Sequence, residues 1–247
     1  MDTKQILKTA RRNGHIRQSK TDNAVDVVIY VILAFCLIVT AYPFIFAISA
    51  SFSSTHAVMS GSVRFLPVEP TVYAYSIIFK NSKILTGYLN SILYTVVGTG
   101  INLLLTMLCA FCLSRKDFYG KSVMNALLVF TMFFSGGMIP TYLLVKKLNM
   151  LNTIWAMVLP NAMNAWYVII TRTYLSSAIP GELYEAADLD GCSVYKTLVL
   201  ITLPLSGPIL AVIGLYVAIG IWNGYFDAFM YLTKSEMQPL QIVLRDI

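Results

Sequence analysis

Long apolar runs separated by short polar or charged stretches make up most of the chain. A helix needs about 20 predominantly apolar residues to cross a bilayer. Runs of roughly that length occupy residues 25–51, 91–113, 123–145, 154–174 and 205–232. The pattern therefore predicts an all-α, polytopic transmembrane helical bundle over residues 25–247, with five spans visible.

Several of these runs contain residues that disturb a helix. Pro43 predicts a kink in the first run, because proline removes a backbone donor and its ring clashes with the preceding turn. Ser135-Gly136-Gly137 and Pro140 interrupt the third run, and the fourth contains Pro160. The two glycines indicate either a helix broken at mid-membrane or close packing between helices.

The composition strengthens the membrane prediction. Of the 247 residues, 57% are hydrophobic and only 12% are charged, and the mean hydropathy is +0.69. A soluble domain cannot hide that much apolar surface, so the bilayer must be part of the protein's solvent. The formal net charge of +6 is modest and does not indicate a nucleic-acid partner.

The basic residues indicate the orientation. Residues 1–24 form a basic segment ahead of the first run, with Lys4, Lys8, Arg11, Arg12, Arg17 and Lys20. Because such clusters stay on the cytoplasmic side, we expect the N-terminus and the basic loop 114–121 inside, and the segment 53–83 outside. The chain stops after a polar stretch, and a sixth span is expected beyond Ile247.

Catalytic chemistry is not indicated. The two histidines, His15 and His56, lie on opposite sides of the first predicted span, which argues against a histidine-based metal or catalytic centre. Gly120-Lys121-Ser122 has the form of the end of a phosphate-binding loop, but Arg115 stands where that loop needs another glycine. We therefore expect no enzyme activity, metal or cofactor in this chain.

A patterned polar segment at residues 176–204 separates the fourth and fifth runs. Pro180-Gly181-Glu182 is typical of a helix start. The positions that follow share one helical face with two small side chains at its centre: Leu183, Ala186, Ala187 and Asp190. Such a face allows the helix backbone to come close to whatever it contacts.

The second half of this segment predicts another helix. Asp190-Gly191 should end the first helix, since glycine tolerates a left-handed turn. Ser193 can cap a second, amphipathic helix, and Pro204 is predicted to break it before the next span. A force on the first helix would then reach the spans on both sides. An ordinary loop lying on the lipid headgroups explains the same pattern equally well.

Glu185-Ala186-Ala187, then Gly191, then Leu203-Pro204 resemble the "EAA…G…LP" cytoplasmic loop of binding-protein-dependent ABC importer permeases. The stretches "MFFSGGMIPTYLLVKKLNMLNTIWAMVLPNA", "TRTYLSSAIPGELYEAADLDG" and "IWNGYFDAFMYL" are similar to the carbohydrate-uptake branch of that family. Within that branch they resemble permeases for oligosaccharides derived from polysaccharides, which are related to the maltose-system permeases. The resemblance extends over residues 25–247 and implies a type I ABC importer permease fold.

This resemblance implies a multi-pass subunit of a bacterial cytoplasmic (inner) membrane that forms half of a sugar pathway. A solute-binding protein, periplasmic or lipid-anchored outside the cell, would deliver a carbohydrate, here expected to be an oligosaccharide. A related second permease would complete the pathway, and two ABC ATPases would bind ATP and magnesium beneath it. The positions implied to couple this chain to the ATPase are Glu185, Ala186, Ala187, Asp190, Gly191 and Pro204.

A sugar pathway needs hydrogen-bond partners and flat aromatic faces. The candidate residues within the runs are Tyr142, Asn161, Asn164, Tyr167, Tyr216, Trp222 and Asn223, with Trp166 and Tyr225 as further candidates. Helix packing and interfacial belts of Trp and Tyr explain the same residues without a pathway. Asp227 is either a functional acid within the membrane or an interfacial one, and its place near the outer end of the fifth run favours the second.

Two other functions compete with sugar import. One is an ABC permease of the same superfamily for peptides, polyamines or phosphate. The other is a secondary carrier or membrane enzyme that works alone. The sequence shows no internal repeat, no pair of opposite charges within a span and no catalytic set, all of which disfavour the second alternative.

Overall fold

The structure, a computed structural model, describes residues 20–246 and is helical, with no β-strand within that range. This confirms the all-α prediction. The chain divides into two compact units, with unit 1 ending at Ile78 and unit 2 beginning at Phe79.

Unit 1 contains the long helix α2 (Lys20–Ser51), which includes Pro43. Two short helices follow it in the segment predicted to lie outside, α3 (Thr55–Met59) and α4 (Tyr73–Lys80). No part of the most apolar window of α2 is buried within the chain. A helix that is apolar on all sides needs lipid or another subunit around it, so α2 confirms the first predicted run as a candidate span.

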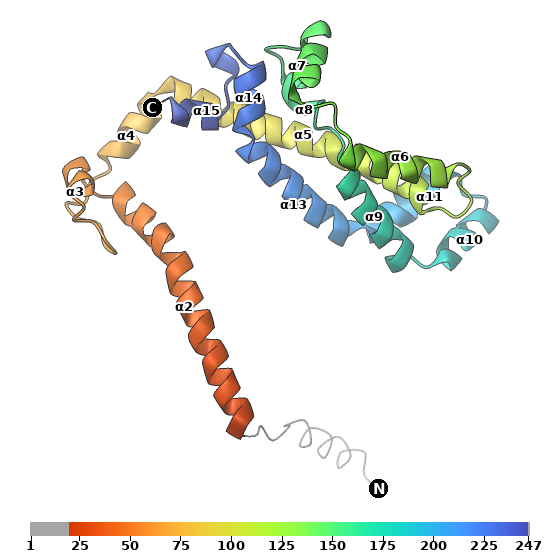
Figure 1. Cartoon of the computed structure of the whole chain (residues 1–247), viewed down its shortest axis with the longest axis horizontal. Coiled ribbons are helices and arrows are strands. Elements are labelled where there is room, and N and C mark those ends of the chain that lie inside the picture. The colour runs from red at the N-terminus through yellow and green to blue at the C-terminus, as the bar shows by residue number, and fades with distance from the viewer. Residues whose placement is uncertain (1–19, 247) are drawn as a thin grey trace. The chain divides into compact units, whose positions relative to one another are not determined.

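Unit 2 is organised around α5 (Ser82–Ser114), a helix of 33 residues. Packed along it are α13 (Gly207–Asn223), α9 (Ala165–Ala178) and the short α15 (Leu240–Arg245), as Figure 1 shows. The helix begins at Ser82 rather than at 91, so the predicted start was wrong. Polar residues were taken as its boundary, but Asn81 caps the helix by accepting from the Lys83 N–H.

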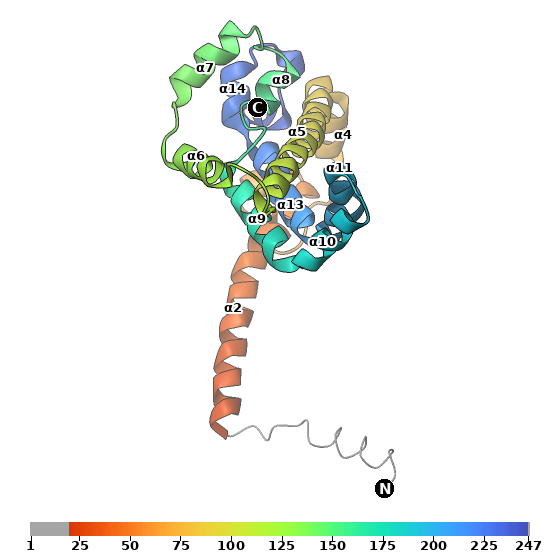
Figure 2. The ribbon, with the colours of Figure 1, turned by 90° about the vertical axis from the view of Figure 1, so that its right-hand side faces the viewer.

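The third run forms two helices, α6 (Lys121–Phe133) and α7 (Met138–Lys147), which are bent by 110°. The break falls where the serine and the two glycines predicted it, and Gly137 has a positive φ of 84°. Figure 2 shows α7 leading away from α6 after this break.

Residues 154–174, predicted as the fourth span, do not form one helix. That run forms α8 (Ile154–Val158) and α9, separated by residues 159–164. Pro160 has no backbone N–H to continue the first helix, and Asn164 caps the second by accepting from the Trp166 N–H at 2.9 Å.

Helix α10 (Gly181–Leu189) follows α9, and then come α11 (Val194–Thr197), the π-helical turn η1 (Leu198–Thr202) and α12 (Leu203–Leu205). The sequence predicted a break at Pro204 before the next span, and the break lies directly after it. The wider π turn, in which the Leu203 N–H bonds to Leu198 O, keeps the chain helical up to the proline. The helix then ends at Leu205, and a bend of 79° precedes α13.

The last run, predicted as one span over 205–232, is divided. After α13 the chain breaks at Gly224 and continues as α14 (Tyr225–Tyr231), η2 (Ser235–Met237) and α15. Within unit 2, α14 and α15 lie at one end of α5, and α10 lies at the other (Figures 1 and 2).

In the part of the chain that the structure describes, two helices are long and apolar enough to cross a membrane, Ala24–Ser51 and Ser82–Ser114. Two bent pairs, Lys121–Phe133 with Met138–Lys147 and Val194–Leu205 with Gly207–Asn223, pass the same test when each is counted as one span.

Gly98 permits the close approach of α13 to α5. A Cβ there would lie 2.7 Å from Ile221 Cδ1, whereas nothing lies within 4 Å of a Cβ at Gly100. We expect Gly98→Leu to lower the thermal unfolding midpoint of the purified protein in detergent, because overpacking costs about 1–3 kcal/mol. Gly100→Leu is the matched control, and an equal loss in both variants would contradict the close contact.

Candidate coupling loop and polar pocket

Helix α10 begins after Pro180 and carries Glu182 in its first turn. It ends as the sequence predicted: the Asp190 N–H bonds to Ala186 O, and Gly191 has a φ of +71°. A left-handed residue with no side chain costs little strain at such a helix end. Ser193 then caps α11 by accepting from the Lys196 N–H, again as predicted.

The exposed side of α10 is open to a partner. Ala187 is 3% exposed and packs inward, whereas the side chains of Glu185 and Ala186 are exposed. The four residues predicted to share one contact face therefore divide: Ala187 faces this chain, and Leu183, Ala186 and Asp190 are open.

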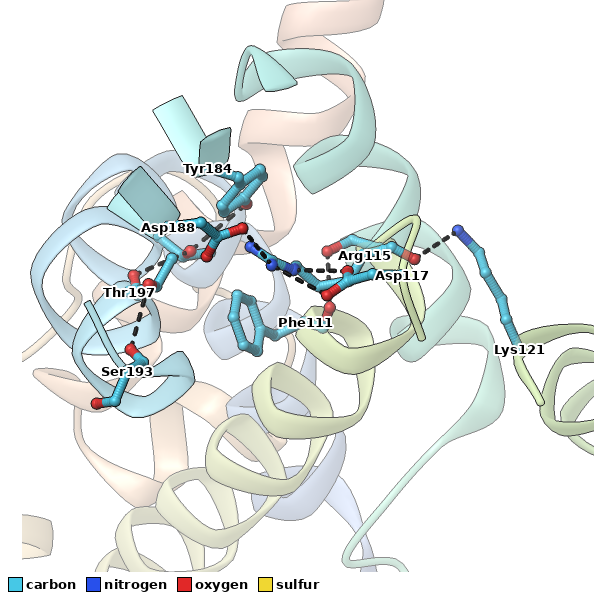
Figure 3. A network of polar contacts seen from close by, with 10 residues as sticks. Phe111, Arg115, Asp117, Lys121, Tyr184, Asp188, Ser193 and Thr197 are labelled. Carbon is cyan, nitrogen blue, oxygen red and sulfur yellow. Dashed lines mark hydrogen bonds and ion pairs between the residues drawn. The ribbon is translucent and has the colours of Figure 1, made fainter. Parts of the chain in front are cut away.

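Arg115, the residue that caps the C-terminus of α5, ties α10 to α5 (Figure 3). Its Nε and Nη2 donate to the two carboxylate oxygens of Asp117 at 3.0 and 3.1 Å. Nη2 also donates to Asp188 Oδ2 of α10 at 3.1 Å. The guanidinium lies over the ring of Tyr184, 5.1 Å from its centroid. One side chain thus connects the end of α5, the loop after it and α10.

The charges in this network reinforce one another. The hydrogen bonds from Arg115 hold the pKa of Asp117 below its usual value, and those to Asp117 raise the pKa of Arg115 above its usual value. Both groups therefore stay charged at neutral pH, and the two hydrogen bonds from the Arg115 guanidinium to the Asp117 carboxylate remain intact.

Part-way along α5 lies a pocket of about 220 Å³. Its polar lining comprises Asn102, Asn161, Asn164, Tyr167, Tyr216 and Asp227. The pocket exists because helices break beside it: Asn161 and Asn164 belong to the gap between α8 and α9, and Asp227 follows the break at Gly224.

Side-chain amides satisfy the polar groups at these breaks. Asn102, which is 2% exposed, donates from Nδ2 to Asn161 O at 3.2 Å and accepts from Thr106 Oγ1 at 3.2 Å. Asn161 in turn donates from Nδ2 to Asp227 Oδ2 at 2.8 Å. The chain of bonds links α5, the gap and α14, leaving other carboxylate and amide positions free to meet a ligand.

Comparison with known proteins gives relatives over most of the chain. The polygalacturonan/rhamnogalacturonan transport system permease protein YtcP of Bacillus subtilis (strain 168) is 40% identical over 222 residues, 90% of this chain and 77% of the relative. Protein LplC of the same organism is 40% identical over 209 residues, 85% of this chain and 70% of the relative.

A solved structure is also similar to this chain, namely the crystal structure of a bacterial ABC transporter involved in the import of the acidic polysaccharide alginate. The TM-score is 0.88 with 35% sequence identity, and the match covers 94% of this chain and 82% of that one. No family model matches the chain.

The chain belongs to the carbohydrate ABC transporter permeases. This confirms the family that the EAA-type segment indicated. The permease is accordingly an integral membrane protein and a transport subunit rather than an enzyme.

Four of the seven pathway candidates of this permease meet at the pocket: Asn161, Asn164, Tyr167 and Tyr216. Three do not. Tyr142 stacks on Tyr231 with a centroid distance of 6.3 Å, and Trp222 packs edge-on against Tyr88 at 5.7 Å. Asn223 bonds to the Ile219 carbonyl of its own helix at 3.0 Å.

Sequence reasoning missed Asn102, although a buried amide in the middle of a span was a signal in itself. Of the two roles that the sequence left open for Asp227, the structure shows that it lines the pocket and accepts a hydrogen bond from Asn161. Arg115 was noted as the residue that rules out a phosphate-binding loop, and its link to α10 was missed because Asp188 is 73 positions away in sequence.

Proposed function

We propose that this permease forms half of the pathway of an ATP-driven importer, together with a related second permease and two ABC ATPases. The observation that carries the proposal is one of placement within unit 2. An open EAA-type helix, α10, lies at one end of α5, and a polar pocket lies part-way along the same helix. A partner that moves α10 can thereby act on the pocket.

The proposed contact with the ATPase is the open side of α10 and the turn after it. Glu185 and Ala186 offer a charge beside a small side chain, so another protein can approach the backbone closely. Ala187, Asp190, Gly191 and Pro204 shape the loop around that contact. ATP and magnesium belong to the ATPase in this proposal.

The proposed topology places the N-terminus and α10 in the cytoplasm and residues 53–83 outside, with five spans. Broken helices are compatible with a membrane only where protein or a wet cavity covers the freed backbone groups. The gap at residues 159–164 meets that condition, since Asn102 bonds to a carbonyl within it. A solute-binding protein would deliver the cargo on the outer side.

The proposed cargo is an oligosaccharide. Amides, phenols and a carboxylate in the pocket provide the donors, acceptors and rings that bind sugar hydroxyls and faces. Among the residues that the structure describes, Asp227 is the one charged residue lining the pocket, and its carboxylate would repel an anion, so this half of the pathway suits an uncharged sugar unit. The similar solved transporter is named for the acidic polysaccharide alginate, which makes acidic oligosaccharides the informative comparison. Uptake of a non-sugar solute in place of both classes would overturn the proposal.

Glu185 provides the test of ATPase docking. We expect Glu185→Lys to reduce co-purified ATPase about tenfold, the change that ~1.4 kcal/mol of binding free energy produces. The measurement is the ATPase-to-permease ratio after affinity purification. Glu236→Lys is the control, because it makes the same charge change on exposed η2 at the other end of α5. Unchanged association in Glu185→Lys would contradict docking at α10.

Asn161 and Asn223 separate a pocket role from a packing role. We expect Asn161→Ala to lower sugar uptake by reconstituted transporter about tenfold, because a hydrogen bond to a charged group is worth about 1.5–3 kcal/mol. Asn223→Ala removes the same amide from a position at the end of α13 that does not line the pocket, and it should leave uptake near the wild-type rate. Equal uptake in the two variants would contradict the assignment of the pocket to the pathway.

A further inference from the structure

Helix α10 is connected to the rest of unit 2 by the chain and by side-chain contacts. The chain enters from α9 and leaves toward α11 and α13. Tyr184 contacts Phe111 of α5 and the Thr202 hydroxyl, and Asp188 pairs with Arg115 at the end of α5. The contacts with α5 join two helices that are not adjacent in sequence.

The Arg115 side chain is well placed to transmit motion. It is 11% exposed, while those of Asp117 and Asp188 are 67% and 53% exposed. An exposed ion pair alone contributes little, about 0–1 kcal/mol. Here the two hydrogen bonds to Asp117 already fix the guanidinium in one orientation. Forming the contact with Asp188 therefore costs less side-chain entropy than forming an isolated ion pair.

Apolar packing also holds α10 against the end of α5. The ring of Tyr184 lies under the Arg115 guanidinium and also contacts the ring of Phe111 on α5, with 6.5 Å between ring centroids. Phe111 is 2% exposed. Lys121 Nζ donates to the Arg115 carbonyl at 3.2 Å, which ties the start of α6 to the same point.

The connection from α10 through Arg115 continues along α5 to the pocket. Arg115 and Asn102 are separated by 13 positions along one uninterrupted helix, which is about 20 Å at 1.5 Å per residue. Asn102 bonds to the Asn161 carbonyl, and Asn161 bonds to Asp227. A displacement of the Arg115 end of α5 would therefore move the group that holds the pocket's broken segment.

We propose that Arg115 is a positioning residue that makes α10 and the adjacent end of α5 move as one body, so that the ATPase stroke reaches the pocket through α5. This inference rests on the proposed function. The chain connections through α9 and α13 carry motion as well, but they contain the break at Ile179 and Pro180 between α9 and α10 and the 79° bend before α13. The route through α5 has no such break between Arg115 and Asn102.

The test uses the complete transporter in proteoliposomes and measures sugar molecules imported per ATP hydrolysed. We expect this ratio to fall about fivefold or more in Arg115→Gln and in Asp188→Asn, the lower range for a coupling interaction. Association with the ATPase should be retained. Lys116→Gln is the matched control: it removes the neighbouring cation, which has no hydrogen bond or ion pair within the described part of the chain.

The second variant keeps the test decisive if Arg115→Gln does not fold, because Asp188 is half exposed and its replacement by asparagine preserves the shape. A normal ratio in Asp188→Asn would overturn the inference. Loss of ATPase association in that variant would overturn it too, since the pair would then serve docking rather than transmission. If the wild-type chain imports no sugar with any ATPase, the proposed function itself fails.

Discussion

Unit 2 depends on the packing of α13 and α9 along the straight helix α5. Lipid offers no hydrophobic driving force between helices, so close shape complementarity and polar contacts have to hold them together. Gly98 gives α13 its close approach, and a core of fully buried side chains such as Leu113, Val168 and Leu175 joins α5 to α9. Every functional element of this unit is then placed by its position along α5: Asn102 part-way along, and Arg115 at the end.

The broken helices around α5 create the pocket and set its chemistry. Each break frees backbone groups that lipid cannot satisfy, so a side chain or a wet cavity has to cover them. Asn102 covers one such carbonyl, and the Asn161–Asp227 bond joins the two breaks across the pocket. The helix breaks therefore account both for the backbone groups that need partners and for the polar side chains that can bind a sugar. The same amides serve helix packing and are available to hydroxyl groups.

Local signals in the sequence predicted much of this architecture. The glycine pair before Pro140, the stop at Gly191 and the cap at Ser193 each act within a few residues, and each was confirmed. Several misses involve partners elsewhere. The early turns of α5 pack against the C-terminal segment, since Asn90 donates to Glu236 O and Ser91 Oγ accepts from the Leu240 N–H. The Arg115–Asp188 pair and the Asn102–Asn161 bond join positions far apart in sequence, which a pattern of single residues does not reveal.

Whether α10 and the end of α5 move together can be measured directly as a distance. Spin labels at Tyr119, in the exposed loop after α5, and at Glu182, in the first turn of α10, report on the two sides of the junction. In the assembled transporter their distance distribution should be the same without nucleotide and with ATP bound, while a label pair across the two ATPases changes. A shift between Tyr119 and Glu182 comparable to that of the ATPase pair would show that α10 moves independently of α5 and would contradict the proposed transmission.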